Sequence, residues 1–375
     1  MELNKDQQKL QSEIREFVEE AIIPYAVDFD LKGKVPRETI DRLIQKGYLG
    51  SMIPKEFGGS NFDSVSIGIL NEEIGKACTS VRSLLTVHGM VALAIVKWGS
   101  KEQKKYWLPK MVDGEIIGAF GLTEPNVGSD AKSIETKAQF SSDCYVINGK
   151  KKWITFGQIA NLFLIFAQVE GKPTAFLVPS DTAGFSVLPI SNTLGVRASM
   201  IAEIHMEECR IPKENLVGTE GAGLTYVALK SLDYGRFTIA WGCIGMAQAC
   251  LDDCLSYARK RKQFGAPLRQ HQLIQRMVTE MIVDVKAARL LCHNAALMRD
   301  AYDPDSIMET WNAKYFAAKM TNRVTDNAVQ IHGANGCIAQ NRVERFFRDS
   351  KIMEIIEGTN EMHEILIATN AFRNG

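Results

Sequence analysis

A long helical segment near the middle of the chain limits the possible folds more than any other feature. Residues 224–261 read LTYVALKSLDYGRFTIAWGCIGMAQACLDDCLSYARKR, which has apolar side chains on several helical faces. A helix that is apolar all round must be buried in a bundle or an oligomer. Residues 271–299 and 306–332 repeat this pattern. The sequence therefore predicts that residues 223–375 form a C-terminal helical bundle.

The first third of the chain also has helical periodicity, and the middle third does not. Apolar residues recur at helical spacing from Lys5 to about Ala26, and a second helix is expected from Pro36 to about Gly47. Near Gly114 the period changes. Strands are expected at 145–147 and 150–154, joined by a type I′ hairpin turn at Asn148-Gly149. A second hairpin is expected from strands at 162–169 and 174–178, and a further strand at 201–207. The expected domains are residues 1–113 (helical), 114–222 (β) and 223–375 (helical bundle).

Composition excludes several classes of function. Lys plus Arg and Asp plus Glu both number 44, so the basic excess typical of a nucleic-acid-binding protein is missing. Neither a membrane span nor a signal peptide is expected, and a cytoplasmic location is predicted. The eight cysteines form no CxxC motif and the six histidines form no ligand pair, so buried reduced thiols and no metal site are expected.

Two motifs in the middle third have the residues of a ligand-binding loop. Residues 121–130, GLTEPNVGSD, form a predicted loop with hydroxyls at Thr123 and Ser129, although such a loop is often only a turn. Residues 151–157, KKWITFG, place Trp153 and Thr155 on one predicted sheet face. An indole beside a hydroxyl suits a flat heteroaromatic ring, but a core tryptophan with a hydrogen-bonded threonine fits the pattern equally well.

Three further motifs lie in the C-terminal third. Residues 259–265, RKRKQFG, end the long helix with a basic cluster that either complements the helix dipole or binds pyrophosphate. Residues 330–336, QIHGANG, are typical of a helix C-cap and follow no strand, so they are not a Rossmann fingerprint. In residues 355–361, IIEGTNE, apolar neighbours are expected to desolvate Glu357.

As an ordered set, these five segments closely resemble the acyl-CoA dehydrogenase superfamily, and the resemblance covers nearly the whole chain. It implies a mainly α fold with a central β-barrel-like domain and a C-terminal four-helix bundle, noncovalent FAD, and a homodimer or homotetramer. By match to the family motifs, several residues are expected to contact the cofactor. The flavin half would be contacted by Leu122, Thr123, Ser129, Trp153 and Thr155. Thr359 and Glu361 lie where the chain returns to the cofactor after Glu357. The ADP half of FAD in a neighbouring subunit would be contacted by Arg261, Phe264, Gln272, Gln330 and Gly333.

The resemblance also implies the catalytic residue. Glu357 matches the family's base, and Arg236 and Gly358 are expected to lie beside the substrate. Some members carry the base on an earlier helix, just before the arginine of an LDxxR stretch, but Gly235 occupies that position here. The base would take the α-proton of an acyl thioester while the β-hydrogen leaves as hydride, and burial would raise its pKa toward the working pH. Two departures from the family pattern are Ala334, where a second glycine is usual, and Ile356, where an aromatic residue is common.

The substrate is predicted from residues around the base. Segments 80–90, 231–245 and 347–362 look most like a subgroup from polyketide and nonribosomal peptide pathways that oxidises a three-carbon acyl group on an acyl carrier protein. In that role the chain would convert a 2-amino- or 2-hydroxy-3-oxopropionyl thioester to an aminomalonyl or hydroxymalonyl extender unit. Basic residues at 104–110 or 150–152 would contact the acidic carrier, unless they are only solvated surface.

Three alternatives remain at this point. The first is a short-chain acyl-CoA α,β-dehydrogenase, which would act on a CoA thioester such as butyryl-CoA. The second is a flavin oxidase or monooxygenase on the same scaffold, and the third is a helical binding protein without cofactor. The sequence leaves the electron acceptor open.

Overall fold

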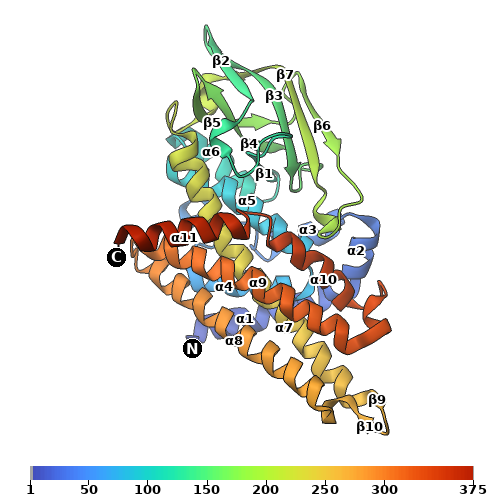
Figure 1. The fold of residues 1–375 in the computed structure, drawn as a ribbon. Helices are drawn as coiled ribbons and strands as arrows, with labels where there is room; N and C mark the ends of the chain where they lie inside the picture. The colour runs from blue at the N-terminus through green and yellow to red at the C-terminus, as the bar shows by residue number, and fades with distance from the viewer. Residues whose placement is uncertain (1–2, 375) are drawn as a thin grey trace.

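The computed structural model describes residues 3–374 and has two helical parts joined by a sheet (Figure 1). The N-terminal helices pack beneath the sheet and beside the long C-terminal helices. Six helices precede the sheet: α1 (Lys5–Ala21), α2 (Ala26–Lys32), α3 (Arg37–Gln45), α4 (Ser64–Ala77), α5 (Thr79–Trp98) and α6 (Lys101–Val112). The first helix ends at Ala21, earlier than its periodicity predicts, and a short 3-10 turn at Ile23–Tyr25 separates it from α2.

The middle part forms one eight-stranded sheet. Its order is β6-β7-β3-β2-β4-β5-β8, with β1 paired in parallel to β4. The strands are β1 (Gly118–Gly121), β2 (Lys137–Ser141), β3 (Cys144–Ile154), β4 (Leu162–Val169), β5 (Lys172–Pro179), β6 (Phe185–Pro189), β7 (Ala202–Pro212) and β8 (Leu216–Val217). The predicted hairpin between residues 162 and 178 is confirmed as β4–β5, which pair antiparallel.

The predicted turn at Asn148-Gly149 is wrong. Residues 144–154 form one continuous strand that pairs antiparallel with β7, and the register shifts between Ile147 and Gly149. The Asn148 side chain accepts from the Glu208 backbone N–H and donates to the Glu208 carboxylate, both at 2.8 Å. These cross-strand bonds use the asparagine to accommodate a bulge, so the Asn-Gly pair bends a strand instead of ending it.

The C-terminal part contains the predicted long helices. They are α7 (Leu229–Lys260), α8 (Gln272–Asp300), α9 (Ser306–His332), α10 (Arg342–Met353) and α11 (Asn360–Asn374), with a small hairpin of β9 (Lys262–Gln263) and β10 (Ala266–Pro267) after α7. A π-helical turn at Gly223–Ala228 leads into α7. Figure 1 shows α7, α8 and α9 lying alongside one another, with the β9–β10 hairpin at the end farthest from the sheet.

Helices α4, α5 and α7 form the core where the three parts meet. Helix α7, which contains Gly245, packs closely on α4, which contains Glu72. A Cβ added to Gly245 would lie 2.0 Å from the Glu72 carbonyl oxygen. Among the described residues, α5 is the one helix long and apolar enough to cross a membrane, and 94% of its most apolar window is buried. Its composition therefore reflects burial between the sheet and the bundle.

Candidate active site

Glu357 lies in the short turn between α10 and α11, and its backbone is left-handed, with φ of 55°. Two cations bind the carbonyl groups of this turn. Arg236 Nε donates to the Glu357 carbonyl at 2.9 Å, and Lys314 Nζ donates to the Gly358 carbonyl at 2.7 Å. Gly358 has φ of 93°, a conformation that favours glycine. The helices α7 and α9, which carry the two cations, therefore hold the turn in an unusual conformation.

The carboxyl group of Glu357 points into the protein. Its Oε2 atom is buried and has no hydrogen-bond partner within residues 3–374. Burial raises the pKa of Glu357 to about 7, although Arg236, Lys314 and Arg82 each act to lower it. At neutral pH such a group is partly deprotonated and can accept a proton, as a general base must.

Gly235 provides the space that this carboxylate occupies. A Cβ added to Gly235 would lie 2.5 Å from Glu357 Oε2 and 2.6 Å from its Cδ. Gly235 therefore lies directly against the Glu357 carboxylate, and a side chain at this position would occupy the space that the carboxylate fills.

Sequence reasoning missed Lys314 and Arg82. Lys314 is fully buried on α9, and burial lowers its pKa to about 8. Arg82 is 1% exposed on α5, and burial lowers its pKa to about 10. The signal was available, because each cation stands among small or apolar residues on a helix whose periodicity predicts burial at that position.

The structure brings the loop at Leu122 next to the segment at Trp153. Lys151 Nζ donates to the Leu122 carbonyl at 3.2 Å, and the Lys152 N–H donates to the Thr123 carbonyl at 2.8 Å. Lys151 also forms an ion pair with Glu124 at 2.6 Å, and both side chains are almost completely buried. Glu124 in turn accepts backbone N–H groups of residues 135 and 136. A buried ion pair thus fixes this loop against the sheet.

Trp153 and Thr155 do not follow the simple strand alternation that was predicted. Trp153 has φ of 63°, the register with β7 shifts between Lys151 and Ile154, and β3 ends at Ile154. The positive φ interrupts the two-residue side-chain period. Trp153 is 53% exposed, so a large flat apolar surface is available to a ligand. Ser129, in the neighbouring loop, is exposed too. These features fit the flat ring system of a flavin.

The five residues predicted to bind the ADP half lie at the far end of the bundle. Arg261 and Phe264 are exposed in the α7–α8 connection, where Phe264 is 97% exposed, and Gln272 is exposed at the start of α8. Gln330 and Gly333 lie at the end of α9, and the Gly333 N–H caps this helix on the Gln330 carbonyl. The two segments meet through Tyr257, whose hydroxyl donates to the His332 carbonyl at 3.4 Å. The β9–β10 hairpin, whose turn contains Phe264, lies at the end of the molecule opposite the sheet (Figure 1).

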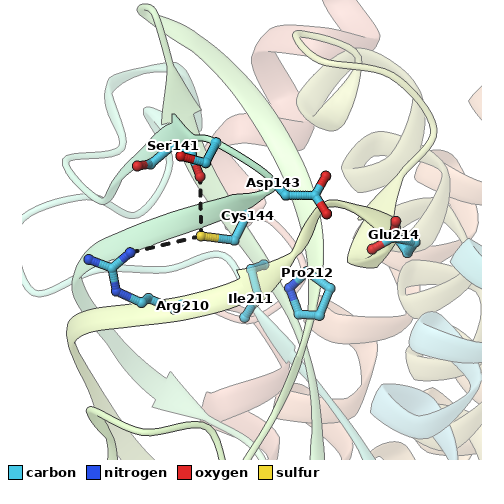
Figure 2. Close-up of a pocket in the computed structure, with 8 residues that line it drawn as sticks. Ser141, Asp143, Cys144, Arg210, Ile211, Pro212 and Glu214 are labelled. Atoms are coloured by element: carbon cyan, nitrogen blue, oxygen red, sulfur yellow. Dashed lines mark hydrogen bonds between the residues drawn. The ribbon is translucent and has the colours of Figure 1, made fainter.

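The remaining predicted residues belong to the start of α11. Thr359 Oγ1 accepts the Met362 N–H at 3.3 Å, so it caps the helix that follows Glu357. Glu361 is exposed beside it. A separate surface hollow lies at the outer end of the sheet (Figure 2). There the Cys144 thiol donates a hydrogen bond to the Ser141 carbonyl and accepts one from Arg210 Nη1. None of the predicted site residues lines that hollow.

The fold and these motifs define a flavin-dependent dehydrogenase, and the family comparisons agree. Models of the acyl-CoA dehydrogenase N-terminal, middle and C-terminal domains match residues 4–115, 119–209 and 221–372. The chain belongs to the acyl-CoA dehydrogenase family, whose members are oxidoreductases that bind FAD.

Individual relatives give the comparison more detail. The chain is 39% identical to the probable acyl-CoA dehydrogenase YngJ of Bacillus subtilis (strain 168), with 98% of each chain covered. It is 36% identical to the mitochondrial short-chain specific acyl-CoA dehydrogenase of Sus scrofa, covering 100% of this chain and 92% of the relative. A solved structure of FkbI, for biosynthesis of the methoxymalonyl extender unit of a polyketide, has a TM-score of 0.89 and 31% identity, covering 97% of this chain and 99% of FkbI.

Proposed function

We propose that this chain oxidises a short acyl thioester, with Glu357 as the base that accepts the substrate proton. The observation that supports this role is the buried, unpartnered Oε2 atom of a carboxyl group whose pKa is about 7. A base with that pKa combines a useful deprotonated fraction with a useful proton affinity at neutral pH. The cations on Arg236, Lys314 and Arg82 would also stabilise negative charge that develops beside Glu357 in the transition state.

The preferred substrate is a three-carbon acyl group on an acyl carrier protein. In its hydrated form, the 3-oxopropionyl aldehyde is a geminal diol. Glu357 would take a hydroxyl proton, and the diol carbon would become a carboxylic acid. FAD, when bound, supplies the acceptor for the hydride that leaves this carbon. The likeness to FkbI supports this choice of substrate.

Residues of this chain would hold the cofactor at two places. The Leu122 loop, Ser129, Trp153 and Thr155 would bind its flavin half. The exposed basic and aromatic residues Arg261, Phe264 and Gln272, with Gln330 and Gly333, would bind the ADP half of a cofactor carried by a second copy. The protein would then be a homodimer or homotetramer, and we propose a cytoplasmic location.

The second candidate is a short-chain acyl-CoA dehydrogenase, which the 36% identity to the Sus scrofa enzyme favours. The α-proton of a CoA thioester would then go to Glu357. Both candidates use the same base and differ in the acyl group and its carrier.

Flavin absorbance under anaerobic conditions tests the proposal. We expect purified holoenzyme to bleach with the carrier-bound 2-amino- or 2-hydroxy-3-oxopropionyl thioester, and Glu357→Gln to lose this response. Glu364→Gln, at a half-exposed carboxylate on α11, is the matched control and should bleach normally. Bleaching with butyryl-CoA alone would favour the second candidate, and bleaching of Glu357→Gln at the normal rate would exclude Glu357 as the base.

A further inference from the structure

Arg82 has a feature that the proposed base and cofactor sites leave unexplained. This guanidinium is 1% exposed, and its Nε and Nη2 atoms have no hydrogen-bond partner in the part of the chain that the structure describes. Leaving buried donors unpaired is costly, and the cost is greater for a charged group. A pKa of about 10 keeps the guanidinium charged at neutral pH. The protein therefore maintains a buried cation with two free donors.

The third nitrogen of the guanidinium has a partner that fixes its orientation. Arg82 Nη1 donates to Thr86 Oγ1 at 2.7 Å, and Thr86 Oγ1 lies 2.9 Å from Thr238 Oγ1. Thr238 Oγ1 donates to the Gly235 carbonyl at 2.9 Å. Because the Thr238 proton is directed to Gly235, the Thr86 hydroxyl donates to Thr238 and accepts from Arg82. This relay leaves the edge formed by Nε and Nη2 free.

The relay also places the guanidinium on the same side of α7 as the proposed base. Gly235, Thr238 and Gly242 are spaced i, i+3 and i+7, so they share one helical face. A Cβ added to Gly235 would meet the Glu357 carboxylate, and one added to Gly242 would lie 2.3 Å from Arg82 Cδ. Thr238 stands about 4.5 Å along the helix axis from Gly235, at 1.5 Å per residue. The terminal carbon of a three-carbon acyl group, which is the reacting carbon in the proposed function, would thus lie between Glu357 and Arg82.

Charge on this face favours an anionic or oxygen-rich ligand. Three cations, Arg236, Lys314 and Arg82, act on the single carboxylate of Glu357. The other groups that act on Arg82 are Asp349 and the thiols of Cys78 and Cys243. Asp349 accepts the Val196 N–H at 2.6 Å, and no hydrogen bond joins it to Arg82 in residues 3–374. No carboxylate of the described residues therefore bonds to the Nε–Nη2 edge of Arg82, and its two donors stay available to a ligand.

We propose that Arg82 is a specificity-determining residue that binds two oxygens on the terminal carbon of the acyl group through Nε and Nη2. The Nε–Nη2 edge of a guanidinium matches a pair of oxygens on one carbon, as in a carboxylate. This inference rests on the proposed function, because it assumes that the acyl group reaches Glu357. Both the hydrated aldehyde and the malonyl-type product of that reaction have such a terminus, and a butyryl group has none.

Binding of unreactive thioesters tests this inference without turnover. Calorimetry would compare malonyl and propionyl thioesters, each presented on CoA and on a phosphopantetheinylated carrier protein, with wild-type holoenzyme and Arg82→Met. We expect wild type to prefer the malonyl group, and Arg82→Met to lose on the order of 100-fold in malonyl affinity while propionyl affinity changes little. Arg82→Lys should restore part of the preference, because it keeps the charge and loses the two-donor edge.

Further variants separate a loss of ligand binding from a failure of the protein to fold. Arg345→Met removes another buried arginine with unpaired nitrogens, at a site that bonds the Ala77 carbonyl, and should leave the malonyl preference intact. If Arg82→Met does not fold, Thr86→Val removes the acceptor that orients Nη1 and should reduce the preference. Equal binding of the two acyl groups by wild type, no binding of either, or an unchanged preference in the variants would overturn the inference. Flavin bleaching by Glu357→Gln would instead count against the proposed base.

Discussion

The two places where the motifs gather differ in how the fold treats charge. At the Glu357 turn and the Leu122 loop, cations are buried and bonded to backbone carbonyls, as Lys314 and Lys151 are. At the end of the bundle, Arg261 and Phe264 project from a short hairpin and are exposed. In the first region, hydrogen bonds within one chain hold the site. The second offers donors and an aromatic ring on an open surface, which suits a site that is completed by another molecule.

The largest expected effect follows from breaking the buried ion pair of Lys151 and Glu124. Lys151→Met leaves Glu124 as a buried charge without its cation, which costs about 3–5 kcal/mol of folding free energy. Urea denaturation would measure the loss. Lys150→Met, at the exposed neighbour, is the matched control and should change stability by no more than about 0.5 kcal/mol. Equal effects of the two substitutions would show that the Leu122 loop is not held by buried charge.

The second prediction concerns the pH dependence of stability at Glu357. Its pKa rises from 4.5 to about 7 in the folded protein, so folding favours the protonated form. Ionisation therefore costs stability as pH rises from 4.5 to 7, and the full cost above pH 7 is about 3 kcal/mol. Glu357→Gln resembles the protonated group, so it should gain about this much relative to wild type between pH 5 and pH 8.

Denaturation curves of wild type and Glu357→Gln at pH 5 and pH 8 would measure this difference. Glu364→Gln should follow wild type at both values. A Glu357→Gln curve that shifts equally at the two pH values would mean that the carboxylate is solvated in the folded protein.

The third prediction tests how tightly α7 packs on the base. Gly235→Ala places a methyl group where Glu357 Oε2 and Cδ now lie, so the carboxylate must move. A displacement of about 1 Å lowers turnover on the order of 100-fold, although alanine is a better helix former than glycine. Steady-state kinetics with the accepted thioester, together with a melting curve, would separate these effects. Normal turnover in Gly235→Ala would show that the base does not need its present position.

The sequence predicted the helices of this fold better than its strand connections. Apolar periodicity located the helix at 306–332 to the residue, because burial in the bundle determines that pattern. Asn148-Gly149 was misread because pairing of β3 with β7 along its length outweighs a local turn preference. Motif order singled out Glu357 and Gly235, which lie against each other in the structure. Lys314 and Arg82 were missed as neighbours of Glu357, because a periodic pattern predicts that a side chain is buried and not which distant segment it contacts.

The smallest expected effect belongs to the exposed end of the bundle. Phe264 is 97% exposed, so Phe264→Ala removes no packing within the chain and should change its folding free energy by less than about 0.5 kcal/mol. If a cofactor from a second copy covers this ring, the same variant should weaken FAD binding by about tenfold, since an aromatic contact contributes about 0.5–1.5 kcal/mol beyond buried area. Denaturation of flavin-free protein and an FAD titration would give the two values. A marked loss of stability without FAD would mean that Phe264 is already packed against protein in solution. Phe264 would then be exposed only in an isolated chain, and the two regions would not differ in the assembled protein.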